Sequence, residues 1–377
     1  MGYNARMRQF LDAARLAAIG ISVVTAVCGP AKAFVIVPTI DMGAAGTDAH
    51  SFNNASDPAG EVAAIDTAVS SIESQFSNAG TIRILFQYDS GVLGQSQDGE
   101  NFVPWSNYTG QLSADSAAHP TNTVLATAVA NIAAGNSATY VLGTTAFLRV
   151  GLGMSGGGTT PCYDASGAFV SGCNAVYDGI ISLGNMSAAL GGPGLNSKAV
   201  SVAEHEINEV LGGGGTGSTV GENLSGFLPA GQTAIGPTDL YRYQSASSTC
   251  LGVDSTPSYT TSSTAVACYS VDGGKTAIAR MNQAGGGSDY GDFASGVANI
   301  QDAFYPGSTP LFTSASPEFQ MLSSIGYDAP EPSSLALIAG AIGGLGWIRR
   351  RRARVGRGWV EAGWRHVAPL TSLIPRP

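Results

Sequence analysis

The sequence is poor in charged residues, and positive charge is the scarcer kind. Charged residues make up 12% of the 377 residues, and Lys plus Arg number 18 against 27 Asp plus Glu. The basic residues gather at the two ends, so that residues 34–348 contain only 6 of them beside 25 acidic residues. An acidic surface of this kind repels nucleic acid and anionic membranes and favours cations. The composition therefore argues against a nucleic-acid partner.

Cysteine is also scarce, and its spacing lacks the C-x-x-C pairs of common zinc-binding modules. Apart from Cys28 four cysteines are present, and pairing between near neighbours predicts two disulfides, Cys162–Cys173 and Cys250–Cys268. Each bridge would close a loop rich in Gly, Ser or Thr, as expected in an oxidising compartment. A zinc site made of the four cysteines is the alternative, and the spacing disfavours it.

The first 33 residues have the three parts of a secretory signal peptide. Arg6, Arg8 and Arg15 come first, an apolar run covers residues 16–27, and Ala31-Lys32-Ala33 supplies an A-x-A cleavage site. Residues 1–33 are therefore predicted to be removed on export.

The other end carries a second targeting signal. Pro330-Glu331-Pro332 is followed by an apolar stretch at residues 335–348 and by four arginines at 349–352. The apolar stretch is short for a membrane span, and its basic flank marks the cytoplasmic side. This order of features resembles the PEP-CTERM sorting signal of Gram-negative bacteria. The resemblance implies membrane handling by an exosortase-type enzyme and delivery to the cell surface or the extracellular matrix. We expect a sorting signal with a transmembrane segment at residues 329–354 and a basic tail at 355–377.

Residues 200–215 predict an amphipathic helix with one face suited to a metal ion. At about 100° per residue, His205 and Glu209 share one side of the helix and the apolar residues lie nearly opposite. Glu206 lies one step round the helix, where its carboxylate could reach a water held by the other two side chains. Zinc peptidases with H-E-x-x-H use this spacing, and Glu209 here supplies a carboxylate in place of the second histidine. The glycine run that begins at Gly212 ends the helix.

A solvated acidic helix face is the alternative explanation of this stretch. In that case His205 is merely one polar residue among three glutamates. Because charge is rare in this chain, three glutamates and a histidine within the six positions 204–209 favour a metal site.

A third ligand must come from outside the helix. The longer pattern H-E-x-x-H-x-x-G-x-x-H would place it at Gly215, which has no side chain. Glu222 is close in sequence but lies in a stretch rich in Gly, Ser and Thr. Asp239 lies among Pro, Leu and Tyr residues typical of an ordered segment, and it is predicted as the third zinc ligand. A salt bridge to Arg242 or a turn cap remains the alternative role for Asp239.

Other candidate residues are expected to be structural. His50 and His119 have polar surroundings and no partner at ligand spacing, which predicts surface histidines. The Asp- and Gly-rich stretches 272–274 and 285–292 contain no D-x-[DN]-x-[DN]-G loop, so they are interpreted as turns rather than calcium sites. Tyr243 could stabilise an oxyanion, although packing in the core is its expected role.

Four ordered motifs lie in the second half of the chain. They are H-E-I-N-E-V-L-G at 205–212, P-T-D-L-Y-R-Y at 237–243, Y-S-V-D-G-G-K-T at 269–276 and D-Y-G-D-F-A-S at 289–295. Together they resemble a family of secreted bacterial proteins assigned as metalloproteases, which often carry PEP-CTERM signals. The resemblance spans about residues 176–327. It implies a zincin-like domain in which H-E-x-x-E is the metal motif.

Residues 34–328 are accordingly expected to form one zincin-like α/β (α+β) domain with a mixed sheet and an active-site helix. Periodicity predicts helices at residues 57–80 and 122–133 and strands at 81–88 and 140–150. The strand at 177–183 is placed beside the active-site helix, at the cleft edge, where a peptide could add to it.

These features predict a secreted zinc-dependent metallopeptidase. His205, Glu209 and Asp239 would bind Zn²⁺, and Glu206 would act as the catalytic acid and base. Its partners would be a protein or peptide substrate and the exosortase-type processing enzyme. The alternative is a non-catalytic cell-surface or matrix protein on a degenerate peptidase scaffold.

Overall fold

The computed structural model describes residues 34–132, 138–154, 162–163, 169–170, 177–184, 197–283, 289–295, 298–304 and 311–330. The predicted signal peptide, nearly all of the predicted sorting signal and the basic tail lie outside these residues. Cys173 also lies outside the described residues, and so does the predicted disulfide between Cys162 and Cys173. Within the described residues, no helix combines the length and the apolar character needed to cross a bilayer.

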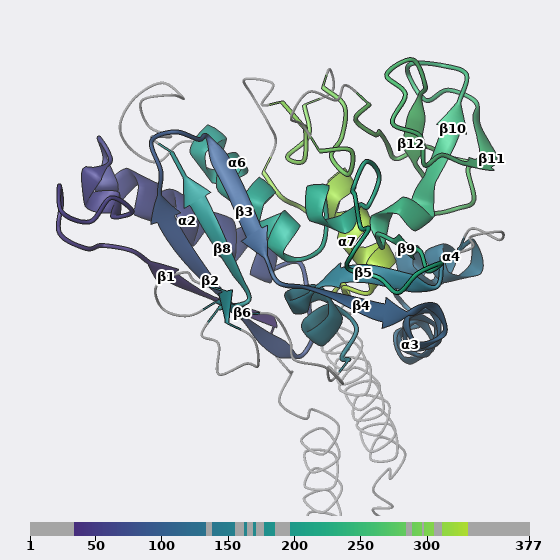
Figure 1. The fold of residues 1–377 in the computed structure, drawn as a ribbon, viewed down its shortest axis with the longest axis horizontal. Helices are drawn as coiled ribbons and strands as arrows, with labels where there is room; N and C mark the ends of the chain where they lie inside the picture. Colours follow the sequence, from purple (N-terminus) through teal and green to yellow (C-terminus); the bar gives the residue numbers. More distant parts are fainter. Residues whose placement is uncertain are drawn as a thin grey trace, which may run out of the picture. The chain divides into compact units, whose positions relative to one another are not determined.

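The first sheet places the helix with the predicted metal motif. Its strand order is β1-β2-β8-β3, with β1, β2 and β8 parallel and β3 antiparallel to β8. Helix α2 contacts both β1 and helix α6, and α6 contacts β3 and β8, so the two helices pack side by side on one face of the sheet (Figure 1). The elements are β1 (Phe34–Ile40), α2 (Pro58–Glu73), β2 (Gly80–Tyr88), β3 (Gly94–Asp98), β8 (Gly179–Leu183) and α6 (Ser197–Val210).

The strand predicted at 177–183 corresponds to β8, and its position differs from the prediction in one respect. It contacts α6, as expected, but it pairs with β2 on one side and β3 on the other. The edge strand is β3, whose polar sequence Gly-Gln-Ser-Gln-Asp gives no hydrophobic alternation. A peptide could therefore add to β3 but not to β8.

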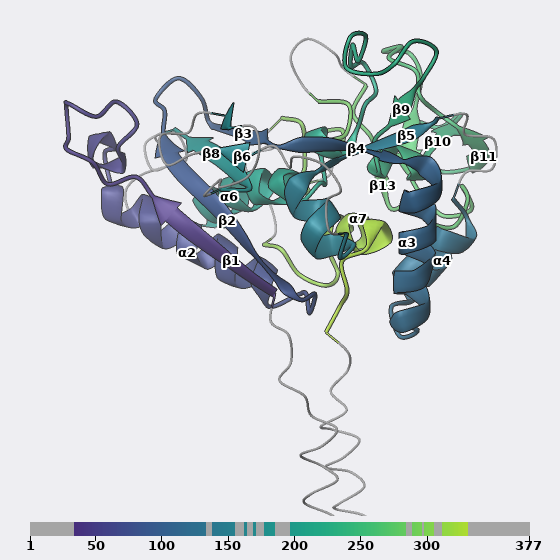
Figure 2. The same cartoon turned by 60° about the horizontal axis from the view of Figure 1, so that its bottom comes forward.

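Three further sheets and three α-helices complete the described fold (Figure 2). A three-stranded sheet has the order β4-β5-β9, and a four-stranded sheet has the order β11-β10-β12-β13. The elements are β4 (Glu100–Pro104), α3 (Trp105–Ala118), α4 (Thr123–Ala130), β5 (Tyr140–Thr144), β9 (Ala234–Ile235), β10 (Arg242–Ser245), β11 (Val253–Pro257), β12 (Ala267–Tyr269), β13 (Ala279–Arg280) and α7 (Pro317–Ile325); β6 (Cys162–Tyr163) pairs with β7 (Phe169–Val170).

One hydrophobic core joins these layers, and the described residues up to Ala329 belong to one compact unit. The fold is thus mixed α/β, as predicted. The predicted helices begin where expected, with Asp57 and Asn122 as N-caps that accept backbone hydrogen bonds. The predicted strand 140–150 ends at Thr144, whose hydroxyl accepts the N–H of Phe147 (3.2 Å), and a helical turn follows at residues 147–151.

Tyr327 and Asp328, at the end of the compact unit, contact residues near its beginning. The ring of Tyr327 meets that of Phe34 edge-on at 5.9 Å between centroids. The N–H of Asp328 donates to Oδ1 of Asn78 (2.8 Å), and the Asp328 carboxylate lies 2.9 Å from Nδ1 of His119. His50 is exposed, as predicted.

His119 does have partners, contrary to the prediction. Asp115 lies one turn earlier on the same side of α3, 3.2 Å from the His119 ring nitrogen, and Asp328 approaches from the far end of the chain. The four-residue spacing between Asp115 and His119 can be recognised in the sequence, but the approach of Asp328 depends on the tertiary fold.

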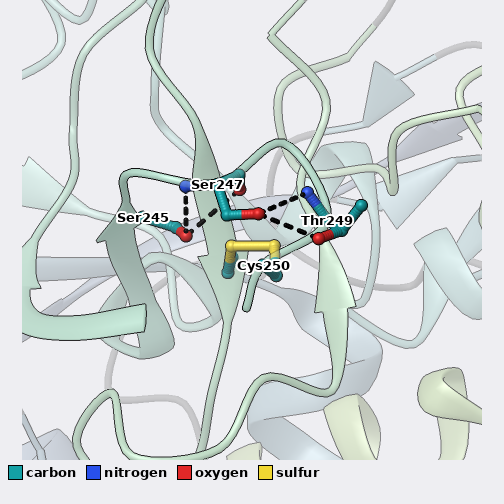
Figure 3. Close-up of a disulfide and its surroundings, with 5 residues drawn as sticks. Ser245, Ser247, Thr249 and Cys250 are labelled. Atoms are coloured by element: carbon teal, nitrogen blue, oxygen red, sulfur yellow. Dashed lines mark hydrogen bonds between the residues drawn. A yellow bond between two sulfur atoms is a disulfide. The ribbon is translucent and has the colours of Figure 1, made fainter. Parts of the chain in front are cut away.

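The predicted bridge between Cys250 and Cys268 is present. It ties the turn between β10 and β11 to β12 across a sequence separation of 18. Figure 3 shows hydroxyl groups arranged around this turn: Oγ of Ser245 accepts the N–H of Ser247 (3.1 Å), and Oγ of Ser247 lies 2.8 Å from Oγ1 of Thr249. The disulfide therefore cross-links a segment whose other local hydrogen bonds are exposed or only partly buried.

Removing this disulfide should destabilise the protein without touching the acidic helix. We expect the double substitution Cys250→Ala and Cys268→Ala to lower the free energy of unfolding by about 3 kcal/mol, because the unfolded chain regains loop entropy. Urea titration followed by circular dichroism measures the change. An unchanged denaturation midpoint would contradict a stabilising role for the bridge.

Candidate metal centre

Helix α6 is buried almost all round: of residues 199–210, only His205 is partly exposed, and most of the apolar residues lie on the side away from it. Ala203, Ile207 and Val210 are fully buried, and the helix packs between α2 and the strands β3 and β8. This burial fixes the rotation of the helix about its axis. His205 and Glu209, four residues apart, therefore project toward the same side, as predicted.

The glycine run after α6 both ends the helix and orients Glu209. Gly212 has a φ of +86°, a left-handed conformation that glycine adopts readily, and its N–H donates to the carbonyl of Glu209 (2.8 Å). The chain then turns back, and the N–H of Gly215 donates to Oε1 of Glu209 (3.2 Å). From the opposite wall, the hydroxyl of Ser96 on β3 donates to Oε2 of Glu209 (2.8 Å). Both oxygens of this carboxylate are thus held in place.

Three side chains converge in an arrangement that could hold a metal ion. Each of His205, Glu209 and Asp292 offers one ligand atom, and these atoms lie within 4.8 Å of one another. Nε2 of His205 is 3.7 Å from Oε1 of Glu209. One imidazole nitrogen and two carboxylate oxygens form a donor set that suits a divalent cation.

The hydrogen bonds of His205 leave the correct nitrogen for a ligand role. Nδ1 lies 2.9 Å from the carbonyl oxygen of Ile300, and a carbonyl can only accept, so Nδ1 carries a proton. Nε2, which lies 3.7 Å from Oε1 of Glu209, is then the ring nitrogen that a metal ion could bind. Metal-binding histidines are commonly oriented by a bond of this kind on the other ring nitrogen.

Gln301 links Asp292 to His205 and Asn208 of helix α6. Its amide nitrogen lies 3.2 Å from Nε2 of His205 and donates to Oδ1 of Asp292 (2.9 Å). Its amide oxygen accepts from Nδ2 of Asn208 on α6 (2.6 Å). Gln301 is fully buried, so this amide fixes the position of Asp292 relative to the helix.

Glu206 lies beside the three converging side chains, against the edge strand. It is 5% exposed, and a Cβ added at Gly94 of β3 would lie 2.2 Å from Oε1 of Glu206. Only glycine lets the strand pass so close to this carboxylate. Within the described part of the chain, no residue forms a hydrogen bond with the Glu206 carboxylate, which leaves its oxygens available to a water or a substrate.

The electrostatics of this group favour a bound cation. Burial and the charge of Glu209 raise the pKa of Glu206 well above its usual range, and burial raises that of Asp292 to about 8. Burial also raises the pKa of Glu209, but the contact with His205 outweighs it and leaves this pKa lowered. Burial lowers the pKa of His205, but the surrounding carboxylates raise it by more. A divalent cation would displace these protons and neutralise the carboxylates.

The structure does not bring Asp239, the predicted third ligand, to this group. Asp239 is fully buried, its Oδ1 accepts from the hydroxyl of Ser218 (2.6 Å), and its Oδ2 accepts the N–H of Thr219 (2.7 Å). Its carboxylate thus holds the turn at residues 218–219, which matches the alternative of a turn cap. Arg242 instead donates to the carbonyls of Tyr290 and Asn282.

Asp292 takes the place that was predicted for Asp239. It belongs to the D-Y-G-D-F-A-S motif at 289–295, which overlaps the stretch 285–292 that was predicted to form turns. This motif was the feature of the sequence that could have indicated Asp292. No periodicity links Asp292 to a helix 83 residues earlier, so only the fold could select it.

A cleft of about 570 Å³ opens over these residues. Strand β3 forms one wall, and Glu206 and the three converging side chains line it. Glu222, the other candidate ligand from the sequence, is an exposed residue at this cleft. Among the described residues that line the cleft, none is Lys or Arg.

Comparisons with protein-family profiles, curated proteins and solved structures give no match for this chain. The chemistry of the cleft residues therefore carries the functional interpretation. Tyr243, the other residue considered for catalysis, is buried and donates its hydroxyl to the carbonyl of Asn131 (3.1 Å), in keeping with a packing role.

Proposed function

We propose that this chain is an exported, zinc-dependent metallopeptidase with a zincin-like domain, which hydrolyses peptide bonds with an activated water. One observation carries the proposal: His205 and Glu209 on α6 meet Asp292 from a remote loop, and Glu206 of the same helix lies at the same cleft. The resemblance of four motifs to secreted bacterial metalloproteases supports it.

Zinc is the cation that we propose for this centre. Zinc accepts histidine nitrogen and carboxylate oxygen, and catalytic sites use three protein ligands and keep a position for water or substrate. His205, Glu209 and Asp292 would provide these ligands. When bound, zinc would polarise the substrate carbonyl and make a water more acidic.

Glu206 is the proposed catalytic acid and base. Its carboxylate has no hydrogen-bond partner among the described residues and faces the cleft, so it can accept a proton from the attacking water. Glu206 would then deliver that proton to the leaving amine nitrogen.

Strand β3 would orient the substrate. It is last in the order of its sheet, and Gly94, Gln95 and Ser96 border the cleft. An extended peptide can pair with such an edge through main-chain hydrogen bonds, which do not depend on the peptide's sequence. This pairing would bring a peptide bond over Glu206, since Gly94 lies against that carboxylate.

Export remains part of the proposal and is supported by the sequence. A signal peptide at residues 1–33 and a PEP-CTERM-type signal recognised by an exosortase-type enzyme would deliver the protein to the cell surface or matrix. The bridge between Cys250 and Cys268 fits an oxidising compartment.

The test measures metal content and proteolysis together. Protein purified without added metal should contain about one zinc per chain, and the His205→Ala variant should contain almost none. Hydrolysis of casein should stop after chelation and return when zinc is restored. Zinc-loaded protein that cleaves no peptide would contradict the proposal, and equally low zinc in both proteins would favour the non-catalytic scaffold.

A further inference from the structure

A second, smaller cavity adjoins the cleft on the other side of Glu206. It has a volume of about 170 Å³ and shares His205, Glu206 and Gly94 with the main cleft. Its apolar walls come from the residue before β3, from α6 and from the loop before α7. They consist of Leu93, Val202, Ile300 and Ala303.

One acidic residue in this cavity lacks a full set of partners. Asp302 is 4% exposed and lines the cavity. Its Oδ1 accepts a hydrogen bond from Nδ2 of Asn299 (3.0 Å), whereas Oδ2 is buried and has no hydrogen-bond partner in the described residues. Leaving a carboxylate oxygen buried and unbonded is costly, because the water that would solvate it has been removed.

Among the described residues, His205 offsets part of the Asp302 charge. No Lys or Arg is among the described residues that line the cavity, and the carboxylates of Glu206 and Glu318 lie nearby. Burial raises the pKa of Asp302 to about 7, although hydrogen bonds from Asn299 lower it. A cation supplied by a ligand would therefore improve the electrostatics of the cavity.

We propose that this cavity is a specificity subsite for a lysine or arginine side chain next to the scissile peptide bond. The inference rests on the proposed peptidase function and names its substrate class. The methylene groups of a basic side chain would pack against Leu93, Val202 and Ile300, and its charged end would bond to Oδ2 of Asp302.

Other side chains fit this cavity less well. An apolar side chain would bury the Asp302 oxygen without giving it a hydrogen bond. An acidic side chain would meet both Asp302 and Glu206 and would be repelled. A long side chain that is apolar along its stem and cationic at its end satisfies both the walls and the carboxylate.

The test compares matched peptides that differ at one position, which carries Lys, Arg, Gln, norleucine or Glu. Binding is measured by fluorescence anisotropy on the zinc-loaded Glu206→Gln chain, and kcat/KM is measured on the zinc-loaded wild-type chain. We expect the Lys and Arg peptides to bind and to be cleaved on the order of 100-fold better than the Gln peptide. Asp302→Asn should reduce this preference at least about tenfold.

Two further variants separate the subsite from general effects. Asp66→Asn makes the same change of charge at an exposed position on α2 and should leave the preference intact. Ala303→Leu should fill the cavity and weaken the preference while leaving Asp302 in place. Thermal melting checks that each variant is folded.

The outcomes distinguish the subsite from the proposed function. Cleavage without a preference for Lys or Arg, or a preference that survives in both Asp302→Asn and Ala303→Leu, would overturn the subsite alone. Binding that prefers Lys or Arg and depends on Asp302, without any cleavage, would support the subsite and overturn the peptidase.

Discussion

Glu206→Gln is expected to lower kcat/KM for peptide hydrolysis by about 1000-fold while the protein keeps its zinc. Glutamine has nearly the same shape as glutamate, so it fits beside Gly94, but its amide cannot accept a proton from water. Because Glu206 is not one of the three converging ligands, its loss should leave the metal centre intact.

The measurement combines steady-state hydrolysis of a fluorogenic peptide with zinc analysis of the same sample. Glu222→Gln is the matched control, since it removes the same charge from an exposed glutamate at the same cleft and should retain most of the activity. Wild-type hydrolysis by Glu206→Gln would remove Glu206 from its catalytic role. Loss of zinc in this variant would mean that Glu206 is a ligand instead.

Asp292→Asn is expected to weaken zinc binding, whereas Asp239→Asn is expected to lower the stability of the fold. Asp292→Asn removes a charged ligand, so the affinity for zinc should fall at least about 100-fold, because even residues behind the ligands contribute 10- to 100-fold. Asp239→Asn should leave zinc affinity nearly unchanged. It should lower the free energy of unfolding by about 1–3 kcal/mol, because Asp239 bonds Ser218 and Thr219 in a buried position.

Zinc affinity is measured by competition with a fluorescent chelator, and stability by urea titration of the metal-free proteins. The two substitutions are chemically identical, so each serves as the control for the other. If Asp239→Asn loses zinc and Asp292→Asn keeps it, the third ligand is the one predicted from the sequence, and the arrangement around Gln301 is not the metal centre.

The sequence could predict those parts of the site that follow from local geometry. A period of 3.6 residues places His205 and Glu209 on one side of a helix whatever the surrounding fold, and the glycines after Leu211 indicate its end. The hydrogen bond from Gly215 to Glu209 is a further result of that turn, but it needs the actual backbone path.

The third ligand and the edge strand could not be derived in the same way. Asp239 and Asp292 both have Gly and aromatic residues close by in the sequence, and the choice between them depends on which loop returns to α6. Strand β3 has a polar sequence because it lies at an edge and faces the cleft, so hydrophobic alternation could not reveal it. The more apolar β8 gave the stronger strand signal because it lies inside the sheet.

The contact of Phe34 with Tyr327 also has a mechanical consequence. The first and the last described residues of the compact unit lie close together: Phe34 packs against Tyr327, and the N–H of Ser77 donates to the carbonyl of Asp328 (2.9 Å). A pulling force applied between the two ends would load β1 and the segment after α7 first, because these contacts link the ends most directly. Helix α6 and strand β3 take no part in these contacts, so tension on the chain would act on the cleft only after the contacts between the two ends had broken.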